Sequence, residues 1–136
     1  MTHAQGKVIL AIRTDKAEAE IGLFADRKKL AGLKWQADRQ LAQELNQKIL
    51  EILNKSSIPY DELSAILVFK GPGSFTGLRI GFSVANALAY SLAIPVVSAS
   101  GPNWLEEGLA QVLSGANEKI ALPNYGAPAK VTKPKK

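Results

Sequence analysis

The stretch "AILVFKGPGSFTGLRIGFSVANALAYSLAIPVVSA", residues 65–99, decides the fold of this chain. It begins with a continuous apolar run at 65–69, which is typical of a strand covered on both faces. A glycine-rich loop follows, and the pattern then predicts a helix over 76–93 and a second buried strand over 95–99. A strand, a helix and a strand in this order predict two parallel strands joined by a crossover helix.

The residues before this stretch predict three strands and one helix. Asp38 can cap the helix, because its carboxylate can accept from the free N–H groups of the first turn. Apolar residues then recur at spacings of three and four as far as Lys55. The expected strands lie at 7–12, 19–26 and 29–36, and the turn "DRKK" joins the last two, which predicts an antiparallel meander.

A last helix is expected after Asn103, which can cap it, so the order of elements is βββαβαβα. This order is typical of the α/β class with a mixed sheet of about five strands. The length of 136 residues fits one domain. We therefore expect a single lobe over 1–115 and an irregular segment with a basic tail over 116–136.

The positive charge of the chain is concentrated in that tail. Without the four lysines of the closing "KVTKPKK", the formal net charge falls from +5 to +1. Such a tail is typical of a solvated chain end. It could also contact nucleic acid through attraction to phosphate groups.

The composition excludes several classes of site. There is no cysteine, so a disulfide or a thiolate metal site is impossible, and His3 is the only histidine, which excludes histidine metal sites and histidine-dependent triads. The carboxylates are scattered and form no evident acid/base pair. No apolar run reaches the roughly 20 residues of a membrane span. We expect a cytoplasmic protein with no catalytic set, metal or cofactor.

The glycine-rich loop lacks the spacing of both common phosphate-binding motifs. Thr76 stands where a Walker A motif has its second glycine, and Gly77 comes one residue late for a dinucleotide fingerprint. An anion could still bind the free N–H groups where the helix begins. Alternatively, Ser74 or Thr76 caps the helix and the glycines permit a sharp turn. The residues of the possible anion site are Gly71, Gly73, Ser74 and Thr76.

The helix over 76–93 carries two apolar rows, one of small and one of bulky residues. The bulky row is suited to covering the sheet, and the small row would let another backbone approach closely. The partner of the small row is either the helix over 38–55 or a second subunit. The small row is Gly77, Gly81, Ala85, Ala89 and Ala93, and the bulky row is Ile80, Val84, Leu88 and Leu92.

Two segments of the chain resemble the TsaB (YeaZ) family, which is related to the TsaD-type proteins. They are "VILAIRT" at 8–14 and "LSAILVFKGPGSFTGLRIGFSVANALAYSLAIPVVSAS" at 63–100, with the same β-β-α pattern between them. The motif GPGSFTGLRIG is highly specific to that family, and the resemblance covers about residues 7–110. It implies a single ribonuclease-H-like lobe of the actin/Hsp70 (ASKHA) type.

The resemblance also implies a role in making threonylcarbamoyladenosine (t6A) in tRNA. It implies a non-catalytic scaffold that binds a TsaD-type transferase, with a TsaE-type ATPase joining the pair and tRNA contacted indirectly or through the basic tail. Isolated family members form homodimers through the same helices, here expected over 38–55 and 76–93. The implied interface residues are Leu41, Leu45, Gly77, Leu78, Gly81, Phe82, Ala85 and Ala89.

Two departures from the family pattern bear on function. The family opens with Ile-Asp-Thr, whereas this chain has Arg13 between Ile12 and Thr14. In the nucleotide-binding relatives that acid orients metal and phosphate, so Arg13 argues against ATP chemistry. Family members also carry a second lobe, for which the residues after the first are too few, so we expect a reduced member that retains the N-terminal lobe. The alternative is a small nucleotide- or phosphate-binding enzyme fragment that uses the loop at 71–76.

Overall fold

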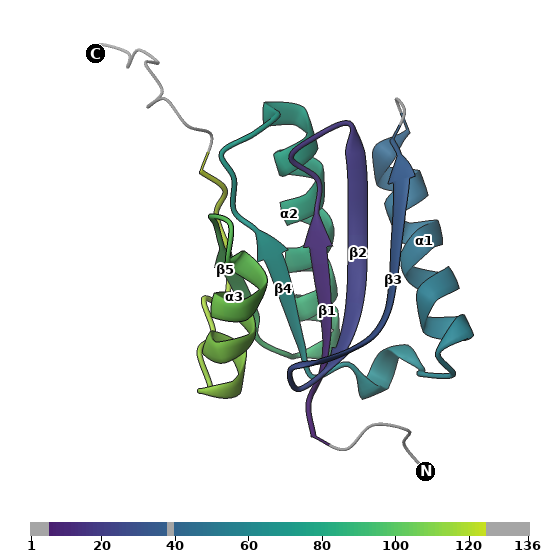
Figure 1. The fold of residues 1–136 in the computed structure, drawn as a ribbon, viewed down its shortest axis with the longest axis vertical. Coiled ribbons are helices and arrows are strands. Elements are labelled where there is room, and N and C mark those ends of the chain that lie inside the picture. The colour runs from purple at the N-terminus through teal and green to yellow at the C-terminus, as the bar shows by residue number, and fades with distance from the viewer. Residues whose placement is uncertain (1–5, 38–39, 125–136) are drawn as a thin grey trace.

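The computed structural model describes residues 6–37 and 40–124, which form one five-stranded sheet with helices on both faces (Figure 1). The strands are β1 (Val8–Arg13), β2 (Glu18–Ala25), β3 (Lys28–Gln36), β4 (Ala65–Phe69) and β5 (Val96–Ala99). The helices are α1 (Leu41–Lys55), α2 (Phe75–Leu92) and α3 (Trp104–Leu113), with a short 3-10 turn, η1 (Tyr60–Glu62). Among the helices of the described part, none has both the length and the apolar content of a membrane-crossing segment.

The sheet has an antiparallel half and a parallel half. Its strand order is β3-β2-β1-β4-β5, in which β1 to β3 pair antiparallel and β1, β4 and β5 pair parallel. The predicted order βββαβαβα and the α/β class are confirmed. Because β1, β4 and β5 run in the same direction, their carboxyl ends lie at one edge of the sheet. That edge carries Arg13 and the glycine-rich loop.

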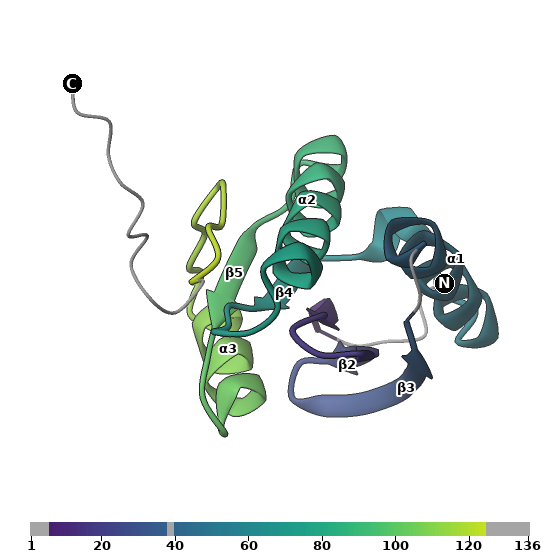
Figure 2. The same cartoon turned by 90° about the horizontal axis from the view of Figure 1, so that it is seen from above.

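Alternation along the strands divides the core into two layers. Leu10, Ile12 and Ile66 pack under α1 and α2, whereas Ile9 and Leu67 point to α3. Figure 2 shows α1 and α2 on one side of the sheet and α3 on the other. The resulting lobe has the mixed sheet and helix arrangement that the family resemblance implies.

Residues 116–124, which form no helix or strand, cover the outer edge of β5. The Glu118 N–H donates to Val96 O at 2.9 Å, and the Glu118 carboxylate accepts from the Ser98 N–H at 2.7 Å. Asn86 of α2 donates its amide to Ala121 O at 3.0 Å and accepts from Ala121 N at 2.9 Å. This edge of the sheet is therefore closed by the chain itself.

The predicted helix caps have different outcomes. Ser74 caps α2, since its hydroxyl accepts from Gly77 N at 3.2 Å. Asn103 precedes α3 as predicted, but its side chain makes no capping hydrogen bond. Asp38 lies outside the described residues, and α1 begins after Gln40, which provides no side-chain cap. A Ser or Asn at the right position therefore predicts where a helix begins better than it predicts the capping bond.

Candidate functional site

The inner side of α2 packs tightly onto the turn between β1 and β2. A Cβ atom on Gly77 would overlap Thr14 O, and a Cβ on Gly81 would overlap the Thr14 hydroxyl. Thr14 Oγ1 donates to Gly77 O at 2.7 Å, and both groups are buried. Only glycine allows the helix backbone to approach the turn this closely.

The prediction that the bulky row of α2 covers the sheet is wrong, and of the two alternatives for the small row the structure favours a partner within the chain. Ala85 and Ala89 are 0% and 3% exposed under the helix, whereas Ile80, Val84 and Leu88 on the other side are only half-buried. The reason is that large sheet residues fill the layer below α2, so the helix needs small residues to approach them. The small row is thus covered within the chain: Gly77 and Gly81 lie on the β1–β2 turn, and Ala85 and Ala89 lie in the core cluster that the sheet and α1 form.

The implied interface residues all lie inside this packing. Their participation in a partner contact remains a prediction, since the chain itself covers their side chains. They shape and support the two helices whose outer surfaces stay open. Buried in the described structure are Leu41, Leu45, Gly77, Leu78, Gly81, Phe82, Ala85 and Ala89.

The open surface of the two helices is a groove between α1 and α2. Small and apolar side chains line it along most of the length of α2. Leu50, one turn beyond Asn46 on α1, is 48% exposed at its margin. We call this surface the α1–α2 face: it consists of Ala42, Asn46 and Leu50 of α1 and of Thr76, Arg79, Ile80, Ser83, Val84, Ala87, Leu88 and Ser91 of α2.

Charge is nearly absent from the α1–α2 face, where Arg79 is the single charged residue. The charged residues of α1 lie on its other flank, toward β3, where Glu44 accepts from the Trp35 indole N–H at 3.2 Å. Farther along that flank, Glu51 pairs with Lys48 at 3.7 Å and with Lys55 at 3.9 Å. Depletion of charge together with apolar, close-packing side chains is typical of the centre of a protein–protein interface.

The glycine-rich loop does not gather its predicted anion-binding residues into one site. Gly73 packs on Asp15, and the Ser74 N–H donates to Asp15 O at 2.9 Å. The Ser74 hydroxyl is occupied by the helix cap, and Thr76 lies in the groove of the α1–α2 face. Gly71, with φ at +100°, packs against the backbone of Asn124. The loop therefore joins three parts of the fold, and the anion site remains a prediction without converging donors.

An ion pair lies at the carboxyl ends of β1 and β4. Arg13 Nε lies 2.7 Å from Asp15 Oδ1, and its Nη2 lies 3.2 Å from Oδ2. The Arg13 guanidinium stacks 3.9 Å from the ring centroid of Phe69, which in turn packs edge-on against Trp104 at 5.4 Å. An incoming anion would have to displace the Asp15 carboxylate, so this edge is poorly suited to phosphate binding.

Sequence reasoning missed the roles of Thr14 and Asp15 as the platform for α2. The available signal was the pair Gly77 and Gly81, which marks a close backbone approach, together with a polar residue directly after the first strand. Residues 6–37 and 40–124 contain no group of three or more side chains suited to a metal.

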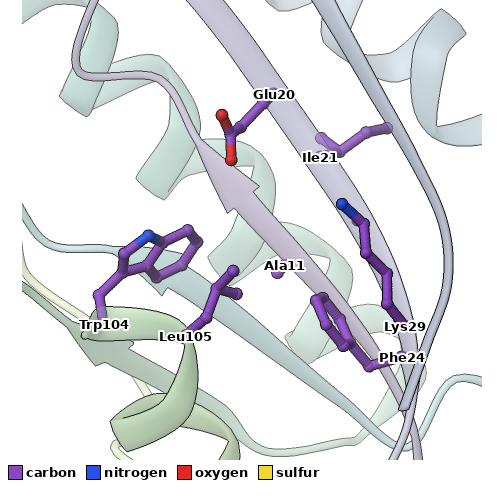
Figure 3. Close-up of a pocket in the computed structure, with 8 residues that line it drawn as sticks. Ala11, Glu20, Ile21, Phe24, Lys29, Trp104 and Leu105 are labelled. Atoms are coloured by element: carbon purple, nitrogen blue, oxygen red, sulfur yellow. The ribbon is translucent and has the colours of Figure 1, made fainter. Parts of the chain in front are cut away.

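A second hollow lies on the α3 side of the sheet, with Ala11 and Gly22 as its floor. Figure 3 shows Trp104 and Leu105 of α3 on one side of it and Lys29 of β3 on the other. Its volume of about 20 Å³ is far below the roughly 300–1,000 Å³ of small-molecule sites. The α1–α2 face is therefore the stronger candidate for function.

Comparison with known proteins bears on the same segment. A family model described as tRNA N6-adenosine threonylcarbamoyltransferase (TsaD) matches residues 35–107, which include α1 and α2. The tRNA threonylcarbamoyladenosine biosynthesis protein TsaB of Bacillus subtilis (strain 168) is 35% identical over 92 residues, which are 68% of this chain and 40% of that protein. The TsaB protein of Escherichia coli (strain K12) is 28% identical over 118 residues, which are 82% of this chain and 51% of that protein.

A solved structure has a similar lobe. YeaZ from Pseudomonas aeruginosa superimposes with a TM-score of 0.64 at 29% sequence identity, over 69% of this chain and 44% of that chain. The chain thus spans about half the length of the curated relatives it matches.

Proposed function

The chain belongs to the TsaB (YeaZ) family, and from this we propose that it is an accessory subunit in the biosynthesis of tRNA t6A that binds a TsaD-type threonylcarbamoyltransferase through its α1–α2 face. In this proposal the transferase subunit carries the chemistry and binds the tRNA, and a TsaE-type ATPase joins the pair. The basic tail at 130–136, which lies outside the described residues, is a further candidate for contact with tRNA.

The observation that carries the proposal is the composition of the α1–α2 face. Ten residues from two adjacent helices line an open groove in which Arg79 is the single charged residue, and Leu50 lies at its margin. Small side chains such as Ala87 and Ser91 would let helices of a partner approach closely, and Val84 and Leu88 would then lose their remaining exposure. A helix-to-helix contact fits this surface better than a small polar ligand does.

The residues at the carboxyl ends of the parallel strands support the assignment of the chemistry to the partner. There Asp15 is engaged by Arg13, and the Ser74 hydroxyl is engaged by the backbone of α2. Neither group is held ready for proton transfer or for nucleophilic attack.

In the absence of the transferase, two copies of the chain would cover the α1–α2 face by forming a homodimer.

Co-expression with the TsaD-type protein of the same organism, followed by size-exclusion chromatography, tests the proposal. The test variant is Ala87→Glu, which places a carboxylate at an exposed position in the middle of the groove. Burying an unpaired carboxylate in the contact is costly, so we expect co-elution to be lost. The matched control is Gln111→Glu, which adds the same group to an exposed position of α3 on the other side of the sheet.

We expect the control to co-elute as the unmodified chain does, and both variants to keep the circular dichroism spectrum of the folded protein. Co-elution of Ala87→Glu with undiminished yield would exclude the α1–α2 face as the contact. Failure of the unmodified chain to co-elute, with unchanged t6A levels after its deletion, would exclude the function itself.

A further inference from the structure

The two edge strands of the sheet, β5 and β3, differ in whether another part of the chain covers them. The short edge strand β5, with four residues, is covered by residues 116–124, and the N–H groups of Val96 and Ser98 both donate to side chains of that segment. The opposite edge strand, β3, has nine residues, and within the described structure no strand pairs with its outer side. Figure 1 shows β3 at the end of the sheet beside α1.

The register identifies the backbone groups that this open edge presents. The Ala37 N–H donates to Ala17 O at 2.8 Å, directly beyond the pair Gln36 and Glu18. In an antiparallel ladder the bonding direction alternates from residue to residue. Leu33 and Trp35 therefore direct their N–H and C=O groups to β2, and Gly32, Lys34 and Gln36 direct theirs outward.

The side chains of the same edge differ between the two faces of the sheet. On the α1 side, Ala31, Leu33 and Trp35 are apolar and only half-buried. From 27 to 37 the chain carries four positive charges and no acidic residue. The exposed cations are Arg27, Lys28, Lys29 and Lys34, and the carboxylate nearest by register is Glu20, opposite Lys34 on β2.

We propose that the outer edge of β3 accepts an extended acidic segment of a partner protein as an added strand. Main-chain bonds would form with Gly32, Lys34 and Gln36, which is the general mode of strand addition. Apolar residues at alternate positions of the segment would cover Leu33 and Trp35, and acidic residues between them would face the lysines.

The positive charge of β3 distinguishes among a neutral strand, a second copy of β3 and an acidic strand as the segment that could pair with it. Lysines on an exposed edge discourage pairing with neutral strands, because the incoming backbone would desolvate them without compensation. A second copy of β3 would bring like charges together, which is also unfavourable. An acidic strand removes the penalty, so it is the occupant that fits. This surface is separate from the α1–α2 face, and the inference does not rest on the proposed transferase contact.

The test uses the full chain and a labelled nonapeptide of alternating glutamate and valine. We expect saturable binding by fluorescence anisotropy, and no binding of the same peptide with lysine in place of glutamate. On peptide addition, amide hydrogen exchange should slow at Gly32, Lys34 and Gln36, whose N–H groups face outward. Leu33 and Trp35 already donate to β2, so their exchange should change little.

Two substitutions at one position separate charge from main-chain bonding. Lys34→Gln removes the charge alone and is expected to weaken binding roughly two- to fivefold. Lys34→Pro removes the charge and also the outward N–H group, and it leaves the hydrogen bonds between β3 and β2 intact. We expect it to bind the peptide about two- to tenfold more weakly than Lys34→Gln does. Lys55→Gln, at an exposed position of α1, is the charge control and should bind as the unmodified chain does.

Three outcomes would overturn the inference. Unchanged exchange at Gly32, Lys34 and Gln36 with bound peptide would place the peptide elsewhere. Displacement of the peptide by a short uridine oligonucleotide of equal affinity would mean that any polyanion suffices. Self-association of the chain that Lys34→Pro abolishes would make a second copy the occupant. The exchange measurement on the unmodified chain decides the matter even where Lys34→Pro fails to fold.

Discussion

The two sides of helix α2 are both uncharged over most of their length, but the inner side packs within the lobe and the outer side lines the groove of the α1–α2 face. The inner side buries Leu78 and Phe82 together with a row of small residues, of which Gly77 and Gly81 lie against Thr14 with no room for a Cβ atom. The outer side combines small residues such as Ala87 with Ile80 and Leu88, which remain half-exposed. Contact between the α2 backbone and the β1–β2 turn thus requires glycine, whereas partly exposed apolar side chains mark the surface that is left for a partner.

Gly77→Val is the strongest test of this difference, because it introduces side-chain atoms where Thr14 O already lies. Glycine is a poor helix former, so a substitution at a position with free space would stabilise the helix. Here the backbone of the β1–β2 turn cannot yield cheaply, and we expect the free energy of unfolding to fall by about 3 kcal/mol or more. Urea denaturation followed by circular dichroism measures the change.

Gly77→Ala supplies the graded control for that experiment. It adds the Cβ alone, so the clash with Thr14 O opposes the gain in helix propensity. We expect a smaller loss of stability than for valine, but still a loss. A gain of stability in either variant would show that the helix has room to shift and that the inner side is not tightly packed.

Thr14→Val is the next largest expected effect, since it removes the hydroxyl that donates to Gly77 O at 2.7 Å while keeping the shape of the side chain. The Gly77 carbonyl retains a helical donor four residues on, so it is not left without a partner. We therefore expect a loss of about 1–2 kcal/mol in the free energy of unfolding by urea titration. Thr14→Ser keeps the hydroxyl, and if it is as destabilising as valine, the methyl group rather than the bond is what matters.

The sequence was sufficient to predict most of the fold. The apolar runs at 65–69 and 95–99 and the periodic helix between them predicted the parallel half correctly, because buried strands and crossover helices leave strong local patterns. The antiparallel strands were also placed within a few residues. A local pattern sufficed in each case because the period of the apolar residues follows directly from the geometry of the element.

The orientation of α2 could not be predicted in the same way. With apolar residues around most of the helix, its periodicity does not say which row faces the sheet. The answer depends on the size of the sheet side chains below the helix and on the position of Thr14 in the β1–β2 turn, and both are set by the tertiary structure. For the same reason the sequence does not show that Gly81 and Ala85 are buried and that Ser83 and Ala87 form the open side of the helix.

Ser74→Ala examines the junction where the inner side begins. The Ser74 hydroxyl accepts from Gly77 N at 3.2 Å in a partly buried bond, so its loss removes the side-chain acceptor of that N–H group. We expect a loss of about 1 kcal/mol, which is typical of a helix N-cap. Ser74→Asp should restore stability, because a carboxylate also caps and is favoured by the helix dipole. If aspartate is worse than alanine, repulsion from Asp15 outweighs capping.

The smallest expected effect comes from Ser83→Leu. Ser83 lies on the outer side of α2, opposite the buried residues Gly81 and Ala85. Ser83 is exposed and lines the groove of the α1–α2 face, so a larger side chain meets no atoms that must move. Leucine is also the better helix former, and we expect the free energy of unfolding to change by no more than about 0.5 kcal/mol, toward higher stability. The same urea titration used for Gly77→Val measures both, so the contrast is internal to one helix. A loss of more than about 1 kcal/mol at Ser83 would mean that the outer side is itself packed within the isolated chain, and the α1–α2 face would then cease to be a free surface.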